Sequence, residues 1–424
     1  MHTIKDNPPI SGIHHITAVA ASAADNYRFY TRVLGLRLVK KTVNFDDPFT
    51  YHLYYGDETG SPGTLLTFFP WEGLPQGRPG TGMVSAIAFA IPRSSIDYWT
   101  QRLEGYGVAL AAKSRFGEPV IRFTDPHGLP LELIGTLPGD DPSMRELDSR
   151  TAITGFHSAT LLVERIDATE KIIVDAMGMT PGQREGSRYR FAMQDESAPG
   201  HLLDVIVDPS AGRGRSGGGT IHHIAFRTRD TREQQAWRQR LQQHGLSVTD
   251  VRNRTYFQSI YFNEPGGVRF EIATDPPGFS VDEDLNDLGT ALKLPAQYEP
   301  LRGQIEELCT QYGEIHGIWW DMNTMRHHDK TYSDSSINDL IRTLQPKAVV
   351  NNRGFDDGDF GTPERDFHEI SGESGLERRT EACQSVGSSS WGYREAEDYY
   401  THGHLVRSID SFMSRGANYL LNVG

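Results

Sequence analysis

The sequence has little cysteine: its 424 residues include only Cys309 and Cys383, both in the last third of the chain. A framework of disulfide bonds is therefore not expected, and a reducing cytoplasm is the predicted location. Long apolar runs are also missing, and the opening residues MHTIKDNPPI contain no apolar segment of the signal-peptide type. We therefore expect neither a membrane-spanning helix nor export.

The chain has fewer basic than acidic residues: it contains 42 Lys and Arg and 56 Asp and Glu, which gives a formal net charge of -14. Nucleic acids and anionic membranes reward a basic surface, so neither is the expected partner. What is present suits a globular protein, since 37% of the residues are hydrophobic and 23% are charged. The length is sufficient for two or three domains.

A repeat occupies the first 280 residues. Each of four segments opens with an alternating strand, continues through a polar helix-like stretch, and closes with a strand that follows a glycine. The opening phrases are GIHHITAVA from Gly12, MVSAIAFAI from Met83, GFHSATLLV from Gly155 and TIHHIAFRT from Thr220. The closing phrases are GTLLTFF from Gly63, GLPLELI from Gly128, GHLLDVI from Gly200 and GVRFEIA from Gly267. The unit of strand, helix and several strands is therefore used four times.

Two columns of this repeat carry candidate metal ligands. At the second-histidine position, the four units carry His15, Ser85, Ser158 and His223. Five residues into the closing phrase, they carry Thr67, Glu132, Asp204 and Glu271. Pairing the first and fourth units would bring together two histidines, one carboxylate and a weak fourth position at Thr67. Two imidazoles and one carboxylate form the facial triad of non-heme Fe(II) oxygenases.

The alternative is that these residues have no ligand role. A single strand histidine is usually a core or surface residue, and Glu132 and Asp204 are interpreted as solvated strand ends. The coincidence of histidines in two repeats favours ligation by His15, His223 and Glu271. Because neighbouring side chains of a strand point to opposite faces, one histidine of each pair is expected to bind the metal.

These phrases resemble the vicinal oxygen chelate superfamily. Residues 1 to about 300 resemble, more narrowly, its ring-cleaving dioxygenases that open hydroquinones. The matching phrases are GIHHIT, YHLYYGDETGSPGTLLTFFP, GTIHHIAF, NRTYFQSIYFNEPGGVRFEIATD and DEDLNDLGTALKLPAQYEPLR. The resemblance implies an α+β fold of four βαβββ modules in two pairs, with modules 1 and 2 in residues 1–147. Modules 3 and 4, with a C-terminal extension, are expected in residues 148–303.

The resemblance also implies an activity and a site. It implies metal-dependent, extradiol-type cleavage of a hydroquinone or catechol-like ring by O₂, with Fe(II) as the metal and Mn(II) as the alternative. The family ligands fall on His15, His223 and Glu271. Residues in or near substrate contact fall on His14, His222, Arg254 and Tyr261. Arg254 would favour the phenolate, and Tyr261 or His222 would move protons.

His14 and His222 conflict with simple strand alternation. A twist or a bulge near the site would reconcile them with a role there; otherwise they are packing residues. For Arg254 and Tyr261 the alternatives are a solvated arginine and a packed strand tyrosine. A homo-oligomer is compatible with all of these interpretations.

The residues after about 300 have a different pattern, in which strands alternate with helices as in a parallel α/β arrangement. Residues 304–424 resemble part of the catalytic barrel of family 29 α-L-fucosidases, in YGEIHGIWWD, LQPKAVVNNRG, GDFGTPERDF, SWGY and SRGANYLLNVG. The resemblance places the nucleophile at Asp321 and the acid/base at Glu364, with Glu381 as an alternative acid.

This tail is about half of a barrel of roughly 250 residues, so we expect an incomplete, inactive half-barrel fused to the dioxygenase. Two rival interpretations remain. One is a glycoside hydrolase with an N-terminal scaffold, and the other is a non-catalytic ligand-binding member of the same superfamily.

Overall fold

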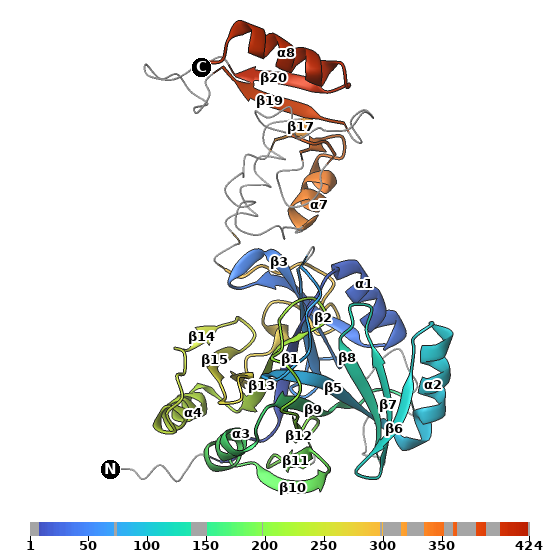
Figure 1. Cartoon of the computed structure of the whole chain (residues 1–424), viewed down its shortest axis with the longest axis vertical. Coiled ribbons are helices and arrows are strands. Elements are labelled where there is room, and N and C mark those ends of the chain that lie inside the picture. Colours follow the sequence, from blue (N-terminus) through green and yellow to red (C-terminus); the bar gives the residue numbers. More distant parts are fainter. Residues whose placement is uncertain are drawn as a thin grey trace. The chain divides into compact units, whose positions relative to one another are not determined.

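The computed structural model describes residues 8–71, 74–136, 151–196, 198–296, 299, 315–319, 335–351, 359–362, 379–386 and 399–422. The chain forms two compact units, Met1–Pro295 and Ala296–Gly424, and Figure 1 shows the elements of each. Asp321 and Glu364 lie outside the described residues.

Unit 1 repeats one βαβββ module four times, which confirms the predicted α+β fold. Module 1 contains β1 (Ile13–Ala20), α1 (Ala23–Arg28), η1 (Phe29–Val33), β2 (Arg37–Asn44), β3 (Asp47–Gly56) and β4 (Leu65–Pro70). Module 2 contains β5 (Met83–Pro92), η2 (Arg93–Ser95), α2 (Ile96–Gly105), β6 (Ala111–Arg115), β7 (Glu118–Thr124) and β8 (Pro130–Thr136). Module 3 contains β9 (Gly155–Val163), α3 (Asp167–Lys171), η3 (Ile172–Ala176), β10 (Thr180–Glu185), β11 (Arg188–Ala192) and β12 (Leu202–Val207). Module 4 contains β13 (Ile221–Thr228), α4 (Thr231–Gln243), β14 (Arg252–Asn253), β15 (Gln258–Asn263) and β16 (Arg269–Thr274), and η4 (Phe279–Val281) follows it.

The modules combine in pairs to build two eight-stranded sheets. Modules 1 and 4 share one sheet, in the order β14-β15-β16-β13-β1-β4-β3-β2. Modules 2 and 3 share the other, in the order β10-β11-β12-β9-β5-β8-β7-β6. The central pairs, β1 with β13 and β5 with β9, are antiparallel. Each sheet therefore combines a module from residues 1–147 with one from 148–303, and the first and fourth opening strands become neighbours.

The helices are held to the sheets by short amphipathic patterns, as α4 shows. Asp230 caps its N-terminus by accepting a 2.8 Å hydrogen bond from the Glu233 backbone N–H. Gln234, Trp237 and Leu241 recur at helical spacing and are buried. The Gln234 side-chain amide also donates to backbone carbonyls of β15 and β16, which fixes the helix against its sheet.

One continuous apolar core joins the two sheets of unit 1, with buried residues from β1, β4, β5, β8, β9, β13 and β16. The segments that connect modules 1 to 2 and 3 to 4 also pair with each other, at Arg78 and Arg215 among other positions. A Cβ atom on Gly80 would lie 2.3 Å from the Gly212 carbonyl oxygen, so this close approach requires glycine.

Unit 2 contains two short parallel pairs of strands in its described part. β17 (Gly317–Ile318) pairs with β18 (Val349–Val350) across α7 (Ser335–Leu344), and β19 (Glu381–Ser385) pairs with β20 (Asn418–Asn422) across α8 (His402–Met413). Both are strand–helix–strand units with parallel strands, as the alternating pattern predicted. They build two two-stranded sheets.

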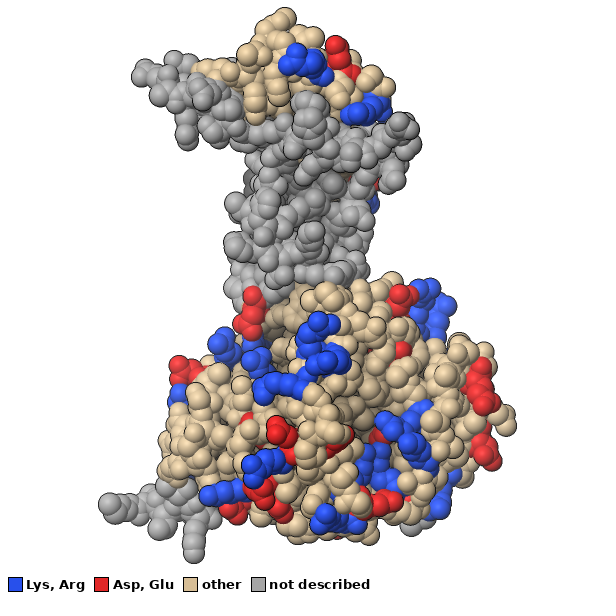
Figure 2. All heavy atoms as spheres, in the orientation of Figure 1, with Lys and Arg blue, Asp and Glu red and all other residues tan. Residues whose placement is uncertain are grey.

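Acidic and basic side chains are interspersed on the face of unit 1 that Figure 2 shows. None of the helices in the described ranges combines the length and apolar character that a membrane crossing needs.

Candidate metal centre

Three central strands of the first sheet bring the candidate ligands to one face. On β1, His15 lies opposite Ala225 of β13, and on β16 Glu271 lies opposite the same alanine. His223 is two residues before Ala225, so it shares that face. The strand pairing thus places His15, His223 and Glu271 on one patch, although up to 256 residues separate them in the sequence.

The three side chains converge on one point. His223 Nε2 lies 2.9 Å from Glu271 Oε2, and His15 Nε2 lies 3.4 Å from the same oxygen. The two Nε2 atoms are 3.3 Å apart. All three side chains are buried, and Glu271 is fully enclosed. Among the described residues, they form the group of three whose ligand atoms lie close enough for one ion.

The charge states of this group suit a cation. Burial alone would raise the pKa of Glu271, yet the His15 and His223 imidazoles beside it hold that pKa well below its usual range. Burial lowers the pKa of His223, in opposition to the Glu271 carboxylate. The site therefore offers an ionised carboxylate and a neutral imidazole, the forms in which these side chains bind metals.

Two observations test whether a divalent metal fits. Glu271 Oε2 is buried and receives no well-directed hydrogen bond from any described group. Ligands about 2.1 Å from one ion and roughly 90–110° apart would be separated by about 3.0–3.4 Å, close to the three distances seen here. The other oxygen, Glu271 Oε1, accepts a 2.5 Å hydrogen bond from the Ser259 hydroxyl, which orients the carboxylate. The residues fit a metal held by three protein ligands.

A β-bulge on each strand explains the paired histidines. The register of β1 against β13 shifts between Ile13 and His15, and again between Thr17 and Ala18, where it leaves out His222. His14 and His222 are therefore the extra residues of two bulges, which lets them turn toward their neighbours. His14 Nδ1 lies 2.9 Å from His15 Nδ1, and His222 Nδ1 lies 2.8 Å from His223 Nδ1. Each extra histidine contacts the ring nitrogen that faces away from the candidate metal position.

Thr67, the expected weak fourth position, is engaged in a polar chain. Its hydroxyl lies 2.8 Å from Thr17 Oγ1 and 2.9 Å from His52 Nε2. The Tyr54 hydroxyl lies 2.7 Å from the other His52 ring nitrogen. Burial raises the pKa of Tyr54, so its hydroxyl stays protonated at neutral pH. His52 lines the same cavity as His15. The sequence analysis missed it, because this histidine belongs to module 1 alone and so forms no column of the repeat.

A cavity of about 740 Å³ opens beside His15 and His223. Aromatic rings form part of its wall, including Phe45, Phe69, Trp71 and Phe257. An aromatic ring of substrate size would therefore find apolar walls next to the candidate metal position.

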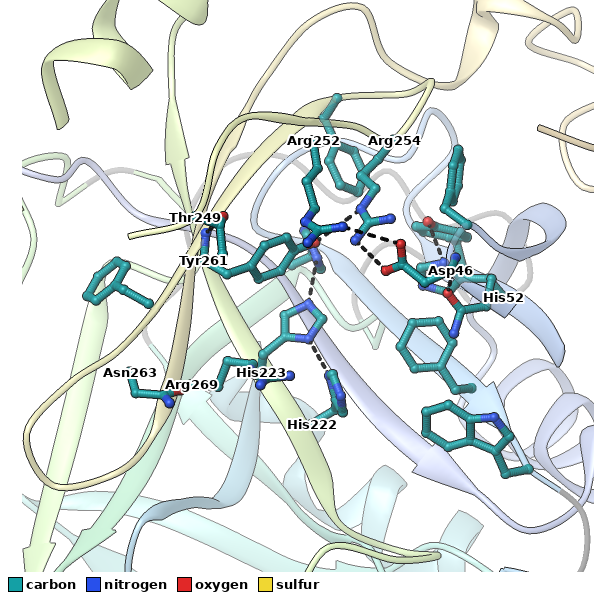
Figure 3. Close-up of a pocket in the computed structure, with 18 of the residues that line it drawn as sticks. Asp46, His52, His222, His223, Thr249, Arg252, Arg254, Tyr261, Asn263 and Arg269 are labelled. Carbon is teal, nitrogen blue, oxygen red and sulfur yellow. Dashed lines mark hydrogen bonds and ion pairs between the residues drawn. The ribbon is translucent and has the colours of Figure 1, made fainter. Parts of the chain in front are cut away.

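Arg254 and Tyr261 line this cavity, as Figure 3 shows. Arg254 Nε donates a 3.3 Å hydrogen bond to the Tyr261 hydroxyl oxygen. The Tyr261 ring meets the His223 ring edge to face, with 5.8 Å between centroids. Burial raises the pKa of Tyr261, so the phenol stays protonated at neutral pH. Four residues were predicted to lie in or near substrate contact. The structure brings all of them close to the candidate ligands: His14, His222, Arg254 and Tyr261.

The second sheet has bulges at the same places as the first, and they show that one position was misaligned between the repeat units. Ser85 of β5 and His157 of β9 are the residues left out of register there. Ser85 therefore corresponds to His14, and Ala86 rather than Ser85 stands at the ligand position. The expectation that aligned Ser85 with His15 is wrong by one residue, because the bulge hides the offset. Ala86 and Ser158 therefore stand at the two positions that His15 and His223 occupy in the first sheet.

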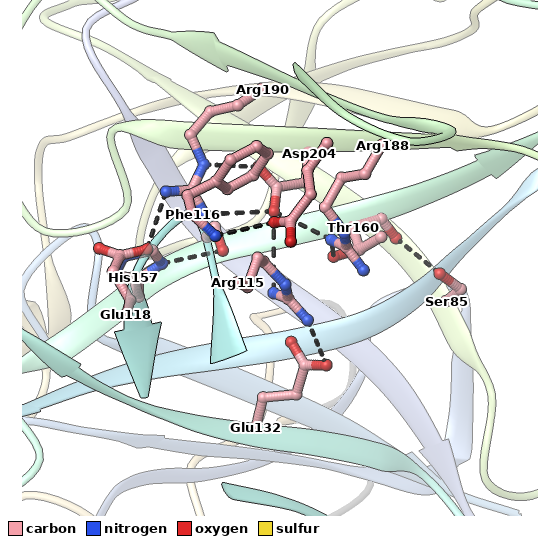
Figure 4. A network of polar contacts seen from close by, with 12 residues as sticks. Ser85, Arg115, Phe116, Glu118, Glu132, His157, Thr160, Arg188, Arg190 and Asp204 are labelled. Atoms are coloured by element: carbon pink, nitrogen blue, oxygen red, sulfur yellow. Dashed lines mark hydrogen bonds and ion pairs between the residues drawn. The ribbon is translucent and has the colours of Figure 1, made fainter. Parts of the chain in front are cut away.

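Arginines surround the carboxylates of the second sheet (Figure 4). Arg115 Nη2 donates a 2.6 Å bond to Glu132. Arg190 Nε and Arg188 Nη1 each donate a 2.9 Å bond to Asp204. Glu132 and Asp204 are buried, so their interpretation as solvated strand ends is wrong. Guanidinium groups neutralise charges that would otherwise be costly to bury.

Of the fucosidase-like candidates, the described residues include Glu381 alone, on β19. Its backbone pairs with Asn418 of β20. The roles proposed for Asp321 and Glu364 therefore remain predictions.

Comparison with known proteins agrees with both resemblances. The Glyoxalase/Bleomycin resistance protein/Dioxygenase superfamily matches residues 12–133 and 155–272, and the Alpha-L-fucosidase family matches residues 245–424. MhqO of Bacillus subtilis, named as a ring-cleaving dioxygenase, is 46% identical over 298 residues, which cover 70% of this chain and 95% of MhqO.

Two further relatives agree. The chlorohydroquinone/hydroquinone 1,2-dioxygenase of Sphingobium indicum is 34% identical over 70% of this chain and 95% of its own. A crystal structure described as a dioxygenase of Bacillus subtilis shares 45% identity, with a TM-score of 0.68, over 71% of this chain and 96% of that one. The chain therefore belongs to the Glyoxalase/Bleomycin resistance protein/Dioxygenase superfamily and, within it, to the ring-cleaving dioxygenases.

Proposed function

We propose that His15, His223 and Glu271 bind one divalent metal, Fe(II) in preference to Mn(II), and that the protein uses O₂ to open the ring of a hydroquinone or catechol-like aromatic. The observation that carries this proposal is the convergence of these three buried side chains beside an aromatic-lined cavity. When bound, the metal would supply Lewis acidity toward a ring hydroxyl and redox chemistry toward O₂. One O₂ and one ring diol are consumed, and both oxygen atoms enter the ring-opened product.

The remaining pocket residues act on the substrate. The Arg254 guanidinium faces the cavity and would favour the phenolate and the negative charge that develops during cleavage. Tyr261, protonated and bonded to Arg254, would donate a hydrogen bond to a substrate oxygen. His14 and His222 would hold the imidazoles of His15 and His223 in orientation through their Nδ1 contacts.

Preference for hydroquinone-type over catechol-type rings rests on the name of the Sphingobium relative, which is 34% identical. The scarcity of cysteine supports a cytoplasmic location. The fucosidase-like segment is proposed to be inactive, because it is too short to form a complete barrel. A glycoside hydrolase with a scaffold in front, or a protein that only sequesters ligands, would leave the buried ligand set without a purpose.

The test is O₂ uptake by the Fe(II)-loaded protein with a panel of hydroquinones and catechols. Isotopically labelled O₂ should place two labelled atoms in the ring-opened acid, and anaerobic mixing should give no product. Ring opening without label in the product would exclude a dioxygenase. No uptake with any member of the panel would favour the ligand-sequestering alternative.

A further inference from the structure

Asp46 links the parts of the cavity wall that modules 1 and 4 contribute. It belongs to the turn between β2 and β3 of module 1, where its backbone N–H donates a 3.0 Å bond to the Asn44 side chain. From this turn its carboxylate reaches module 4 and accepts a 2.8 Å hydrogen bond from Arg254 Nη2. Arg252 Nη1 lies 3.6 Å from the other oxygen of Asp46. Figure 3 shows the carboxylate facing both arginines.

The backbone of Arg254 is already fixed, so its side chain is the part that needs a restraint. The Arg254 backbone N–H donates to the Phe257 carbonyl, and Thr255 next to it adopts a left-handed conformation with φ of 63°. Beyond the backbone, the Arg254 guanidinium donates hydrogen bonds to the Asp46 carboxylate and to the Tyr261 hydroxyl. Its side chain is 13% exposed, while that of Asp46 is 58% exposed. If Asp46 is removed, the Arg254 guanidinium can therefore turn outward into solvent.

We infer that Asp46 is a positioning residue for the reaction: it holds the Arg254 guanidinium against the cavity, where Arg254 in turn holds the Tyr261 hydroxyl. This inference rests on the proposed function for its effect on turnover. The charges agree with it, because the hydrogen bond from Arg254 holds the pKa of Asp46 below its usual range. A guanidinium that is free to swing into solvent would leave the developing phenolate charge without its donor.

The kinetic test is a double-mutant cycle on the Fe(II)-loaded full chain, with Asp46→Ala, Arg254→Ala and the double variant. Asp46→Ala should lower kcat by about 10–100-fold, with a smaller change in KM and unchanged metal content. In the Arg254→Ala background, Asp46→Ala should have no further effect, because Asp46 acts only through Arg254. Additive effects, or wild-type turnover in Asp46→Ala, would overturn the inference.

Asp250→Ala is the matched control. Asp250 accepts a 2.6 Å hydrogen bond from Arg238, so the variant also removes a carboxylate–arginine pair, but outside the cavity lining. We expect wild-type kcat and KM from it. A loss equal to that of Asp46→Ala would mean that any surface pair in module 4 matters, and would count against a specific role for Asp46.

A readout without turnover separates this inference from the proposed function. Phenylglyoxal modifies accessible arginines, and peptide mass spectrometry reports the rate at Arg254. The rate should rise several-fold in Asp46→Ala and stay at the wild-type value in Asp250→Ala. An unchanged rate in Asp46→Ala would show that Arg254 stays in place without Asp46. If the wild type consumes no O₂ but the rate rises as expected, the proposed function fails while the positioning contact stands.

Discussion

The bulged histidines show how one added residue changes what a neighbour can do. His14 and His222 each contact the Nδ1 atom of the next histidine, while the Nε2 atoms of His15 and His223 face Glu271. If the Nε2 atoms bind metal, each Nδ1 carries the proton and donates to the bulged histidine. That hydrogen bond fixes both the tautomer and the ring orientation.

His14→Ala should therefore weaken metal binding by about 10–100-fold without removing a ligand. Titration with Fe(II) under anaerobic conditions measures the affinity. His157→Ala is the matched control, because His157 is the bulged residue of β9 in the second sheet, next to Ser158. It should bind metal as the wild type does. Unchanged affinity in His14→Ala would return His14 to the role of a packing residue.

The polar network of the second sheet predicts a dependence of stability on pH. Burial would raise the pKa of Glu118, but hydrogen bonds from His157 and Arg190 outweigh it and lower the pKa to about 2. The pKa of Glu118 in the folded state is therefore lower than its pKa of about 4.3 in the unfolded chain. Ionised Glu118 thus stabilises the fold above about pH 4.3, and this stabilisation is lost as the pH falls toward 2.

Glu118→Gln should therefore lower the melting temperature by a few degrees at pH 6. The difference from wild type should shrink between about pH 4 and pH 2. Thermal unfolding of both proteins across this range measures it. A difference that is constant with pH would show that the ionised carboxylate is not what stabilises the network.

At the scale of elements, the segment after β16 is fastened to β2 through one buried lysine. Lys40 Nζ donates to the Phe279 carbonyl at 3.2 Å and to Asp282 at 2.6 Å, and it also bonds Glu283. Lys40 is fully buried. Phe279 in turn packs against Tyr54, whose hydroxyl lies 2.7 Å from His52 Nδ1 in the cavity wall. The segment therefore packs against Tyr54, a residue of the cavity wall.

Lys40→Met should destabilise unit 1 by about 3–5 kcal/mol, because the change leaves the buried Glu283 carboxylate without its cation. The neighbouring Lys41→Met, at a half-buried side chain, should change stability by about 0.5 kcal/mol or less. Urea unfolding of the metal-free proteins measures both changes. Equal, small changes in the two variants would contradict the role given to Lys40.

The elements that repeat were predictable from the sequence, and the contacts between them were not. The four opening and closing phrases predicted the modules and led to His15, His223 and Glu271, because repetition makes a column visible. A bulge was only one of the explanations open for His14 and His222, because a strand buried on both faces, such as β1, has no visible alternation for an extra residue to shift. The position of Ser85 was misassigned for the same reason. Asp46 and Ser259 occur in single modules, and their partners depend on pairing between strands.

At the scale of the whole molecule, the chain joins two segments with different family matches. The ligand set and the described cavity lining belong to Met1–Pro295. The fucosidase-like residues Asp321 and Glu364 belong to the other unit. A retaining glycosidase needs its two carboxylates about 5–5.5 Å apart around a bound sugar. Residues 304–424 are about half as long as a complete barrel of roughly 250 residues.

Truncation after residue 303 should therefore leave O₂ uptake within about twofold of the full chain, and the full chain should not hydrolyse a chromogenic α-L-fucoside. Asp321→Ala controls for the second result. Fucoside turnover that disappears in Asp321→Ala would mean that the barrel is completed in some way. Loss of O₂ uptake on truncation would show that the tail contributes to the dioxygenase.

The most direct measurement is the metal content of the purified full chain after loading with Fe(II), compared with Glu271→Ala and Glu132→Gln. Glu271 is one of three converging ligands, whereas Glu132 bonds arginine in the second sheet. The account predicts one metal per chain in wild type and in Glu132→Gln, and almost none in Glu271→Ala. Full metal content in Glu271→Ala, or two metals per wild-type chain, would contradict it.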